Sequence, residues 1–208
     1  MSSSSLRRVP QQGRGTRRIA QILDAAAEII GEVGYDATTT SLIAARAHTA
    51  IGSLYQFFPN KEAIVQGLLE RYRADLRDLH SKVLTPDLLT LPLPTLLDRI
   101  IDPLMDFEMG QRGFKALFVG VHASPEIAQA TRAMTDEVAR RFAGIFTERL
   151  PALDPTLALR YSTITLSIVK AFLGLAASPV LPREVLVTEL KTVLLRYLEP
   201  LVGLRAGE

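Results

Sequence analysis

The side chains with the clearest chemistry lie within residues 38–61, TTTSLIAARAHTAIGSLYQFFPNK. Tyr55 and Lys61 carry a hydroxyl and an ammonium group, which suit the oxygens of a phosphate. Thr39 stands before a run with helical spacing, so its hydroxyl and the free amides of a first helical turn can also contact an anion. Gly52 adds no bulk to the segment between them. These residue types favour non-covalent contact with a phosphate backbone.

Two short helices must position these groups. The threonines at 38–40 offer N-caps for a helix over Ser41–Ala47. A break at His48 and Thr49 precedes a further helix over about Ala50–Phe57. Two short helices joined by a turn of three to four residues form a helix-turn-helix, whose second helix fits the DNA major groove. The alternative is a structural helical hairpin in an unrelated bundle.

The sequence gives little support to catalysis. It has no cysteine and three histidines, and His48, His80 and His122 stand in neither an H-x-x-x-H nor an H-E-x-x-H arrangement. It contains no G-x-S-x-G nucleophile motif and no phosphate-binding loop after a strand. We therefore expect no enzyme activity, no metal and no cofactor. We interpret His48 as a turn residue and His80 as a solvated side chain.

Positive charge is concentrated at the N-terminal end, although the formal net charge is only +2. Residues 1–23 contain five arginines and no acidic residue. This distribution is expected of an end that meets phosphates, and a solvated basic tail is the alternative. The most apolar run, Ser162–Ala177, is interrupted by Lys170, and the basic, polar first residues lack the apolar stretch of a secretory signal. We expect a cytoplasmic protein with no membrane partner.

Helical periodicity extends along every long segment, so the predicted fold class is all-α. We expect a disordered basic tail over 1–15, a three-helix DNA-binding domain with the helix-turn-helix over 16–62, and a larger helical domain for ligand binding and dimerisation over 63–208. A proline-punctuated linker is expected over Pro86–Pro94. The predicted helices are Arg17–Val33, Ser41–Ala47, Ala50–Phe57, Lys61–Leu84, 94–109, 113–122, 125–150, 155–178 and 183–202.

The spacing of apolar and turn residues over 17–65 resembles the tetracycline-repressor (TetR) family of bacterial transcription regulators. The resemblance rests on Ile22, Ala25, Ala26, Ile29, Gly34, Tyr35, Thr38, Thr39, Ile43, Ala44, Ala47, Gly52, Leu54, Tyr55, Phe57, Phe58, Asn60, Lys61 and Glu62. It implies a recognition helix over the third predicted helix. The expected DNA-contacting residues are Arg17, Arg18, Thr38, Thr39, Thr49, Ala50, Ile51, Gly52, Ser53, Tyr55, Gln56 and Lys61.

Three positions depart from the family pattern in the turn, and one of them is Thr49, which replaces the usual valine-like residue. His48 stands where the family usually has glycine, so a non-glycine residue is expected in a left-handed conformation. Ala50 replaces the usual Ser or Thr N-cap, which removes a contribution of about 1 kcal/mol unless Thr49 supplies the cap.

The resemblance also implies a dimer and a small effector. Segment 157–176 is apolar nearly all round, so it must be covered within its own domain or by a partner. We expect a four-helix homodimer interface that contains Leu166, Val169, Leu173, Leu190, Leu194 and Tyr197. The alternative is that these residues are ordinary core of a monomer.

An effector pocket is expected between the helices of the second domain. The candidate ligand-binding residues are Met105, Phe107, Phe114, Phe118, His122, Met134, Phe142, Tyr161 and Ser167. Ordinary core is the alternative for most of them. Asp102 and Asp106, four residues apart, could face a cationic ligand or lie on a solvated face.

Together these observations predict a sequence-specific DNA-binding regulator. We expect a homodimeric repressor that a small, hydrophobic effector releases from a palindromic double-stranded operator. The alternative is a helical dimeric ligand-binding or protein-interaction protein with weak DNA binding.

Overall fold

A computed structural model describes residues 10–111, 113–118, 125–175 and 181–203, and among these it contains helices and no strand. All-α architecture is therefore confirmed for the described part of the chain. The elements are α1 (Pro10–Ala37), α2 (Thr40–Arg46), α3 (Ile51–Tyr55), α4 (Lys61–Val83), the 3₁₀ helix η1 (Pro86–Thr90), α5 (Leu93–Gly110), α6 (Phe114–Phe118), α7 (Pro125–Arg149), α8 (Pro155–Leu175) and α9 (Arg183–Gly203).

The first helix is longer than predicted. It begins at Pro10, so residues 10–15, expected in a disordered tail, are helical, while residues 1–9 lie outside the described ranges. Proline is tolerated at the first position of a helix because its missing N–H would be unpaired there in any case. Gly34 has a φ of 81°, which glycine adopts readily, and it bends the chain toward α2.

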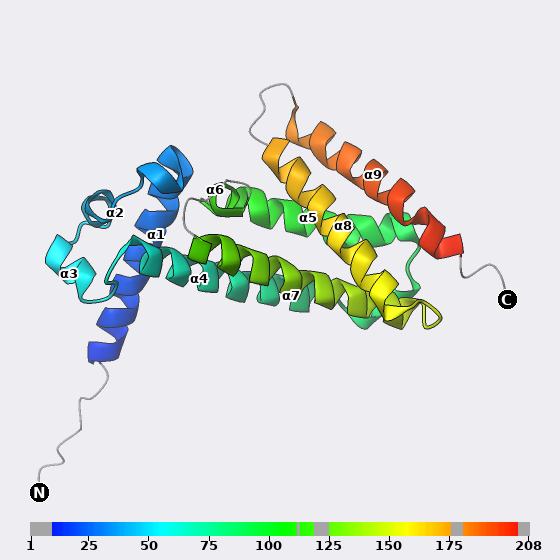
Figure 1. Cartoon of the computed structure of the whole chain (residues 1–208), viewed down its shortest axis with the longest axis horizontal. Coiled ribbons are helices and arrows are strands. Elements are labelled where there is room, and N and C mark those ends of the chain that lie inside the picture. The colour runs from blue at the N-terminus through cyan, green and yellow to red at the C-terminus, as the bar shows by residue number, and fades with distance from the viewer. Residues whose placement is uncertain (1–9, 112, 119–124, 176–180, 204–208) are drawn as a thin grey trace, which may run out of the picture.

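Helices α1 to α3 and the start of α4 form a small core at one end of the molecule (Figure 1). Ile22 and Ile30 of α1, Ile43 of α2 and Leu54 of α3 are fully buried in it. Asn60 caps α4, because its Oδ1 accepts a hydrogen bond of 2.8 Å from the amide of Ala63. These contacts fix the short α2–α3 pair on a longer helical frame.

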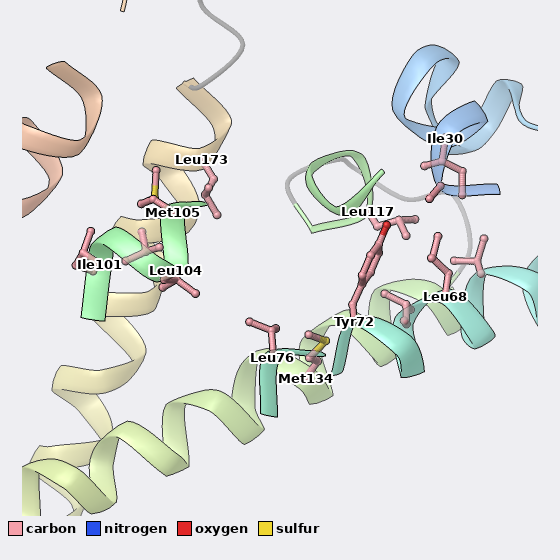
Figure 2. Close-up of a cluster of buried hydrophobic side chains, with 14 of the residues drawn as sticks. Ile30, Leu68, Tyr72, Leu76, Ile101, Leu104, Met105, Leu117, Met134 and Leu173 are labelled. Atoms are coloured by element: carbon pink, nitrogen blue, oxygen red, sulfur yellow. The ribbon is translucent and has the colours of Figure 1, made fainter. Parts of the chain in front are cut away.

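Helix α4 joins this small core to the second part of the chain without a flexible linker. Figure 2 shows Leu68 and Tyr72 of α4 close to Ile30 of α1 and Leu117 of α6, and all four are buried. Further along the cluster, Leu76 and Met134 lie near one another. One apolar cluster therefore continues from the helix-turn-helix into the C-terminal helices.

The segment predicted as a proline-punctuated linker is ordered. Its residues form η1 and the first turn of α5. Arg149, at the end of α7, is buried, and its guanidinium donates hydrogen bonds to the carbonyl oxygens of Leu88, Leu89 and Leu91. A buried cation that satisfies three carbonyls fixes the connection between α4 and α5.

Helix α8 is more exposed than its composition suggests. By length and apolar character it could cross a membrane, which the sequence analysis did not anticipate, and only 22% of its most apolar window is buried. Nevertheless α8 packs against both α7 and α9. Its remaining apolar surface is not covered by the described residues of its own chain.

Candidate nucleic-acid interface and interior cavity

Helix α3 is short and exposed on one side, and its residue types explain how it is anchored to the rest of the molecule. Leu54 is fully buried and anchors the helix, while Ile51, Gly52, Tyr55 and Gln56 are exposed. A Cβ added to Gly52 would have no atom within 4 Å. The helix therefore presents one slim, open face, and Figure 1 shows it at the edge of the molecule.

The turn between α2 and α3 contains a non-glycine residue in the left-handed conformation, as expected. His48 is in the left-handed region with a φ of 49°. The chain turns on backbone hydrogen bonds from His48 to Ala45 (3.1 Å) and from Thr49 to Ala44 (3.0 Å). Ala50, before α3, makes no side-chain capping bond. The left-handed conformation expected at His48 and the absence of a side-chain cap at Ala50 are both confirmed.

Two exposed hydroxyl groups, of Thr39 and Tyr55, lie near the start of α2. Thr39 is exposed, and its hydroxyl oxygen accepts a hydrogen bond of 3.2 Å from the amide of Leu42. The Tyr55 hydroxyl lies 3.1 Å from the hydroxyl of Thr40, which brings the start of α2 to the exposed face of α3. This pair forms a polar edge that a backbone phosphate can approach.

Two predicted DNA contacts are less available than expected. Thr38 is buried, and its hydroxyl donates a 2.7 Å hydrogen bond to the carbonyl of Gly34, so its assignment as a phosphate contact is wrong. Lys61 is half-buried, and its ammonium group donates to the carbonyl of Tyr35 at 3.0 Å and lies 4.2 Å from the centre of the Tyr35 ring. An ammonium group has two further hydrogens, so Lys61 keeps some capacity for an outside acceptor.

The remaining candidates lie near this face. Arg17 is exposed and Arg18 half-exposed on α1, whose N-terminal end extends beyond α2 and α3 in Figure 1. Thr49 and Ser53 are half-exposed. Sequence reasoning missed Arg46, whose guanidinium binds Glu32 (2.8 Å) and Glu28 (3.1 Å) of α1. These carboxylates, Glu32 above all, raise the pKa of Arg46, and the pairing joins α2 to α1.

Two small cavities, of about 60 and 40 Å³, lie among the described residues of the second part of the chain. Leu104, Leu166 and Val169 line both of them, so the two spaces are neighbours separated by these side chains. The other residues of the first cavity are Leu76, His80, Met134, Thr135, Val138, Lys170 and Leu173. The other residues of the second are Leu96, Leu97, Ile100, Ile101, Phe142, Ile145, Phe146, Ser162, Thr165, Leu194 and Leu198.

Three residues that line these cavities each have a buried polar atom without a hydrogen-bond partner: His80 Nε2, Ser162 Oγ and Thr165 Oγ1. The expectation that His80 is solvated is wrong, because α7 and Phe142 cover it and its exposed fraction is 5%. Burial, together with the nearby charge of Arg141, lowers the pKa of His80 to about 4. His80 is therefore a neutral imidazole near neutral pH.

Only part of the predicted ligand set lines the cavities. Met134 and Phe142 do. Met105 is buried in the core, Phe107 packs against that core, and the ring of Tyr161 lies 5.3 Å from that of Tyr197. Ser167 is exposed and bonds to the carbonyl of Thr163, so its assignment as a pocket residue is wrong. The side chains of Phe114, Phe118 and His122 lie outside the described ones.

The residues predicted for a dimer interface are mostly interior. Val169, Leu173, Leu190 and Leu194 are buried within the protomer, which corrects their assignment, because a fully covered side chain has no surface left for a partner. Leu166 lines the cavities, and Tyr197 is half-exposed. The apolar side chains that α8 and α9 do expose are Leu159, Ile164, Leu175, Val185 and Val193.

The acidic residues of α5 already have cationic partners. Lys191 lies 2.7 Å from Asp102 and 2.8 Å from Asp98, and Arg183 pairs with Asp106. These ion pairs join α5 to α9, so Asp102 and Asp106 do not form a site for a cationic ligand.

Comparison with known proteins agrees with both halves of this structure. Residues 22–68 match the profile of bacterial regulatory proteins of the tetR family, and residues 92–198, just over half of the chain, match the tetracyclin repressor-like C-terminal domain. The HTH-type transcriptional repressor KstR of Rhodococcus jostii is 30% identical over 143 residues, which are 66% of this chain and 63% of that protein.

Two further proteins are similar over different lengths. The fatty acid metabolism regulator protein of Bacillus subtilis is 39% identical over 66 residues, 28% of this chain and 34% of that protein. The chain thus matches less than two thirds of either curated relative. A crystal structure of the transcriptional regulator FadR from B. subtilis, in complex with stearoyl-CoA, superposes with a TM-score of 0.67 at 22% identity, covering 86% of this chain and 96% of that one.

Proposed function

Because the chain belongs to the tetR family of bacterial regulatory proteins, whose members are DNA-binding transcription regulators, we propose that it represses transcription in the cytoplasm. In this proposal a homodimer binds a near-palindromic operator and leaves it when a small apolar molecule binds. The family couples DNA binding to small-molecule effectors, so both halves of the chain have a role.

One observation carries the DNA-binding part: α3 is anchored by fully buried Leu54 while its opposite face is exposed. Ser53 and Gln56 can reach base edges from that face, and Tyr55 can reach a phosphate. A five-residue helix reads only a few base pairs. Two copies, one turn of duplex apart (about 34–36 Å), read a useful operator, which is the reason for a dimer.

The exposed apolar side chains of α8 and α9 support dimerisation. Leu159, Ile164 and Val193 are each more than a third exposed. Large apolar patches on a protein surface are typical of association sites, and a two-fold pairing of α8 and α9 would cover this one. Replacing Ile164 and Val193 together by lysine should convert the protein to monomer in sedimentation experiments. A double variant that stays dimeric would place the interface elsewhere.

The cavities support effector binding, because their walls are mostly apolar and the first of them lies beside α4. Helix α4 begins at Lys61, next to the helix-turn-helix, and carries Leu76 and His80 at the first cavity. A ligand that binds more tightly when α4 is displaced shifts the population toward dimers with a different α3 separation. The ratio of the ligand's affinities for the two positions of α4 sets the size of this population shift.

Selection of bound sequences from a random double-stranded pool tests the proposal. A recovered palindrome, bound with an affinity that falls steeply as salt rises, is expected, since each neutralised phosphate contributes a slope near −0.9. Tyr55→Phe should weaken binding to all sequences alike, whereas Gln56→Ala should change sequence preference. Recovery of no motif, with binding that is insensitive to salt, would favour a ligand-binding protein with weak DNA affinity.

A further inference from the structure

His80 divides an apolar interior from a charged entrance. It lines the first cavity together with Leu104, Val169 and Leu173, and it also lines an adjoining opening on the surface side. The two spaces share Leu76, His80, Met134 and Val138, so the opening, of about 10 Å³, adjoins the cavity.

The opening has an excess of positive charge. Arg73, Arg77 and Arg141 line it with a single carboxylate, Glu137. Glu137 is shared, because its oxygens lie 3.4 Å from Arg73 Nε and 3.2 Å from Arg77 Nε. Arg73 is also paired with Glu70 at 2.7 Å, so two carboxylates face three guanidinium groups. The remaining positive charge attracts an anion, and arginine is well suited to carboxylate and phosphate.

The imidazole behind this entrance lacks a hydrogen-bond partner at one nitrogen. His80 Nε2 is buried and unpartnered, and the only ring packed on His80 among the described residues is Phe142, edge to face with centroids 5.5 Å apart. An aromatic ring is a weak hydrogen-bond partner. Leaving a buried polar nitrogen unpaired is unfavourable, so a ligand that bonds to it gains affinity.

We propose that the effector is an apolar chain ending in an anionic group, with the anion between Arg73, Arg77 and Arg141, a hydrogen bond to His80, and the chain in the cavities beyond. The inference rests on the proposed function, because it names the ligand class of the same effector site. Carboxylate and phosphate share the required chemistry.

Ligand entry also requires movement of the interior. The cavities are smaller than the roughly 300–1,000 Å³ of typical ligand pockets, and Leu166 lies between them. A chain that passes His80 must therefore displace Leu166 to join the two spaces. Leu76 and His80 of α4 line the first cavity, so a ligand there also contacts the helix that starts at the helix-turn-helix.

Calorimetric titration of the full-length protein, without DNA, tests the proposal with four ten-carbon probes. Decanoate and decyl phosphate are expected to bind, decanol to bind at least ten-fold more weakly, and decyltrimethylammonium not to bind. If one anion alone binds, that result identifies the head group. Equal affinity for decanoate and decanol would overturn the proposal.

Neighbouring arginines give a matched pair of variants. Arg141→Gln should weaken decanoate binding about ten-fold, because it removes a lining charge, while Arg140→Gln should leave it unchanged, because Arg140 is exposed and does not line the opening. Both changes are on the surface, so both proteins should fold. His80→Phe should weaken the binding of decanoate and decyl phosphate and leave the binding of decanol unchanged. Equal losses in the two arginine variants would contradict the assigned entrance.

Operator binding, measured separately by fluorescence anisotropy, distinguishes the two proposals. A protein that binds an operator but shows no preference for the anionic probes refutes the ligand class and leaves repression standing. A protein that prefers the anions and binds no operator refutes repression and leaves the ligand class standing.

Discussion

Gly113 packs directly on the backbone of Ala27: a Cβ at position 113 would lie 2.6 Å from the Ala27 carbonyl oxygen, and Gly113 has a φ of 76°. Both facts require glycine at this position, since other residues rarely adopt such a φ and a methyl group would clash. The contact joins the turn before α6 to α1 of the DNA-binding part. It is therefore a direct connection between the effector domain and the helix that supports α2 and α3.

Gly113→Ala should destabilise the protein by about 1–3 kcal/mol, from the strained φ and the clash with Ala27. It should also change operator affinity, because α1 must shift to relieve the clash. Denaturant titration and anisotropy measure the two effects. Gly144→Ala is the control, since a Cβ there meets nothing within 4 Å and the helix should gain up to about 1 kcal/mol. Equal stability in the two variants would show that the contact is not tight.

The left-handed His48 predicts a stabilising substitution. At a φ of 49°, glycine avoids the roughly 1–2 kcal/mol cost that an L-residue has in this conformation. His48→Gly should therefore raise the free energy of unfolding by about 0.5–1 kcal/mol, and His48→Val should lower it, because β-branched residues tolerate this region worst. Thermal melts of both variants check the order. A His48→Gly protein less stable than wild type would mean that the imidazole makes a favourable contact.

Gly52 should separate DNA affinity from stability. Gly52→Ala places a methyl group on the exposed face of α3 where no protein atom lies within 4 Å. We expect unchanged or slightly higher stability, because alanine favours a helix by up to about 1 kcal/mol, together with weaker operator binding, because the face that approaches the groove is thicker. Melting and anisotropy on the same preparation test this. Full operator affinity would place the groove contact on other residues.

Burial of His80 predicts a pH dependence of stability. Its pKa is lowered from 6.5 to about 4, so between these values the unfolded chain binds more protons than the folded one. Stability from this group is therefore complete above pH 6.5 and is lost progressively as the pH falls toward 4, by up to roughly 3 kcal/mol. Unfolding free energies of wild type and His80→Phe across this range measure the difference.

The exposed His48 supplies the control for that experiment. His48→Asn should keep the wild-type pH profile, since asparagine tolerates the left-handed conformation and His80 is unchanged. A His80→Phe protein with the same acid sensitivity as wild type would assign the effect to other groups.

Two serines on α8 allow a test of the unpartnered hydroxyl. Ser162 is fully buried without a hydrogen-bond partner, whereas the exposed Ser167 donates to the carbonyl of Thr163 at 2.9 Å. Each change to alanine gains the same helix propensity. The difference between the two variants in the free energy of unfolding therefore depends on the surroundings of the two hydroxyl groups. Ser162→Ala should be more stable than Ser167→Ala by about 1 kcal/mol. If Ser167→Ala is the more stable variant, the Ser162 hydroxyl has a partner in solution.

Local signals in the sequence determined much of this protein. Asn60 was predictable as the cap of α4 from its residue type and position. The left-handed conformation of His48 was expected because the family that the sequence resembles usually has glycine at this position. The spacing around Leu54 predicted which side of α3 is buried, since helical periodicity alone orients an amphipathic segment.

Tertiary structure decided what covers each apolar stripe. Periodicity marks Leu190 and Leu194 as apolar, but it does not tell whether their own chain or a partner covers them, and their own chain does. In the same way, the residue type of His80 suggests exposure, whereas the packing of α4 against α7 buries it. Residues 58 to 61 positions apart meet when Arg149 binds the carbonyls of η1 and Leu91, and no local pattern encodes such contacts. Burial depends on which distant elements meet, and that is a property of the whole fold.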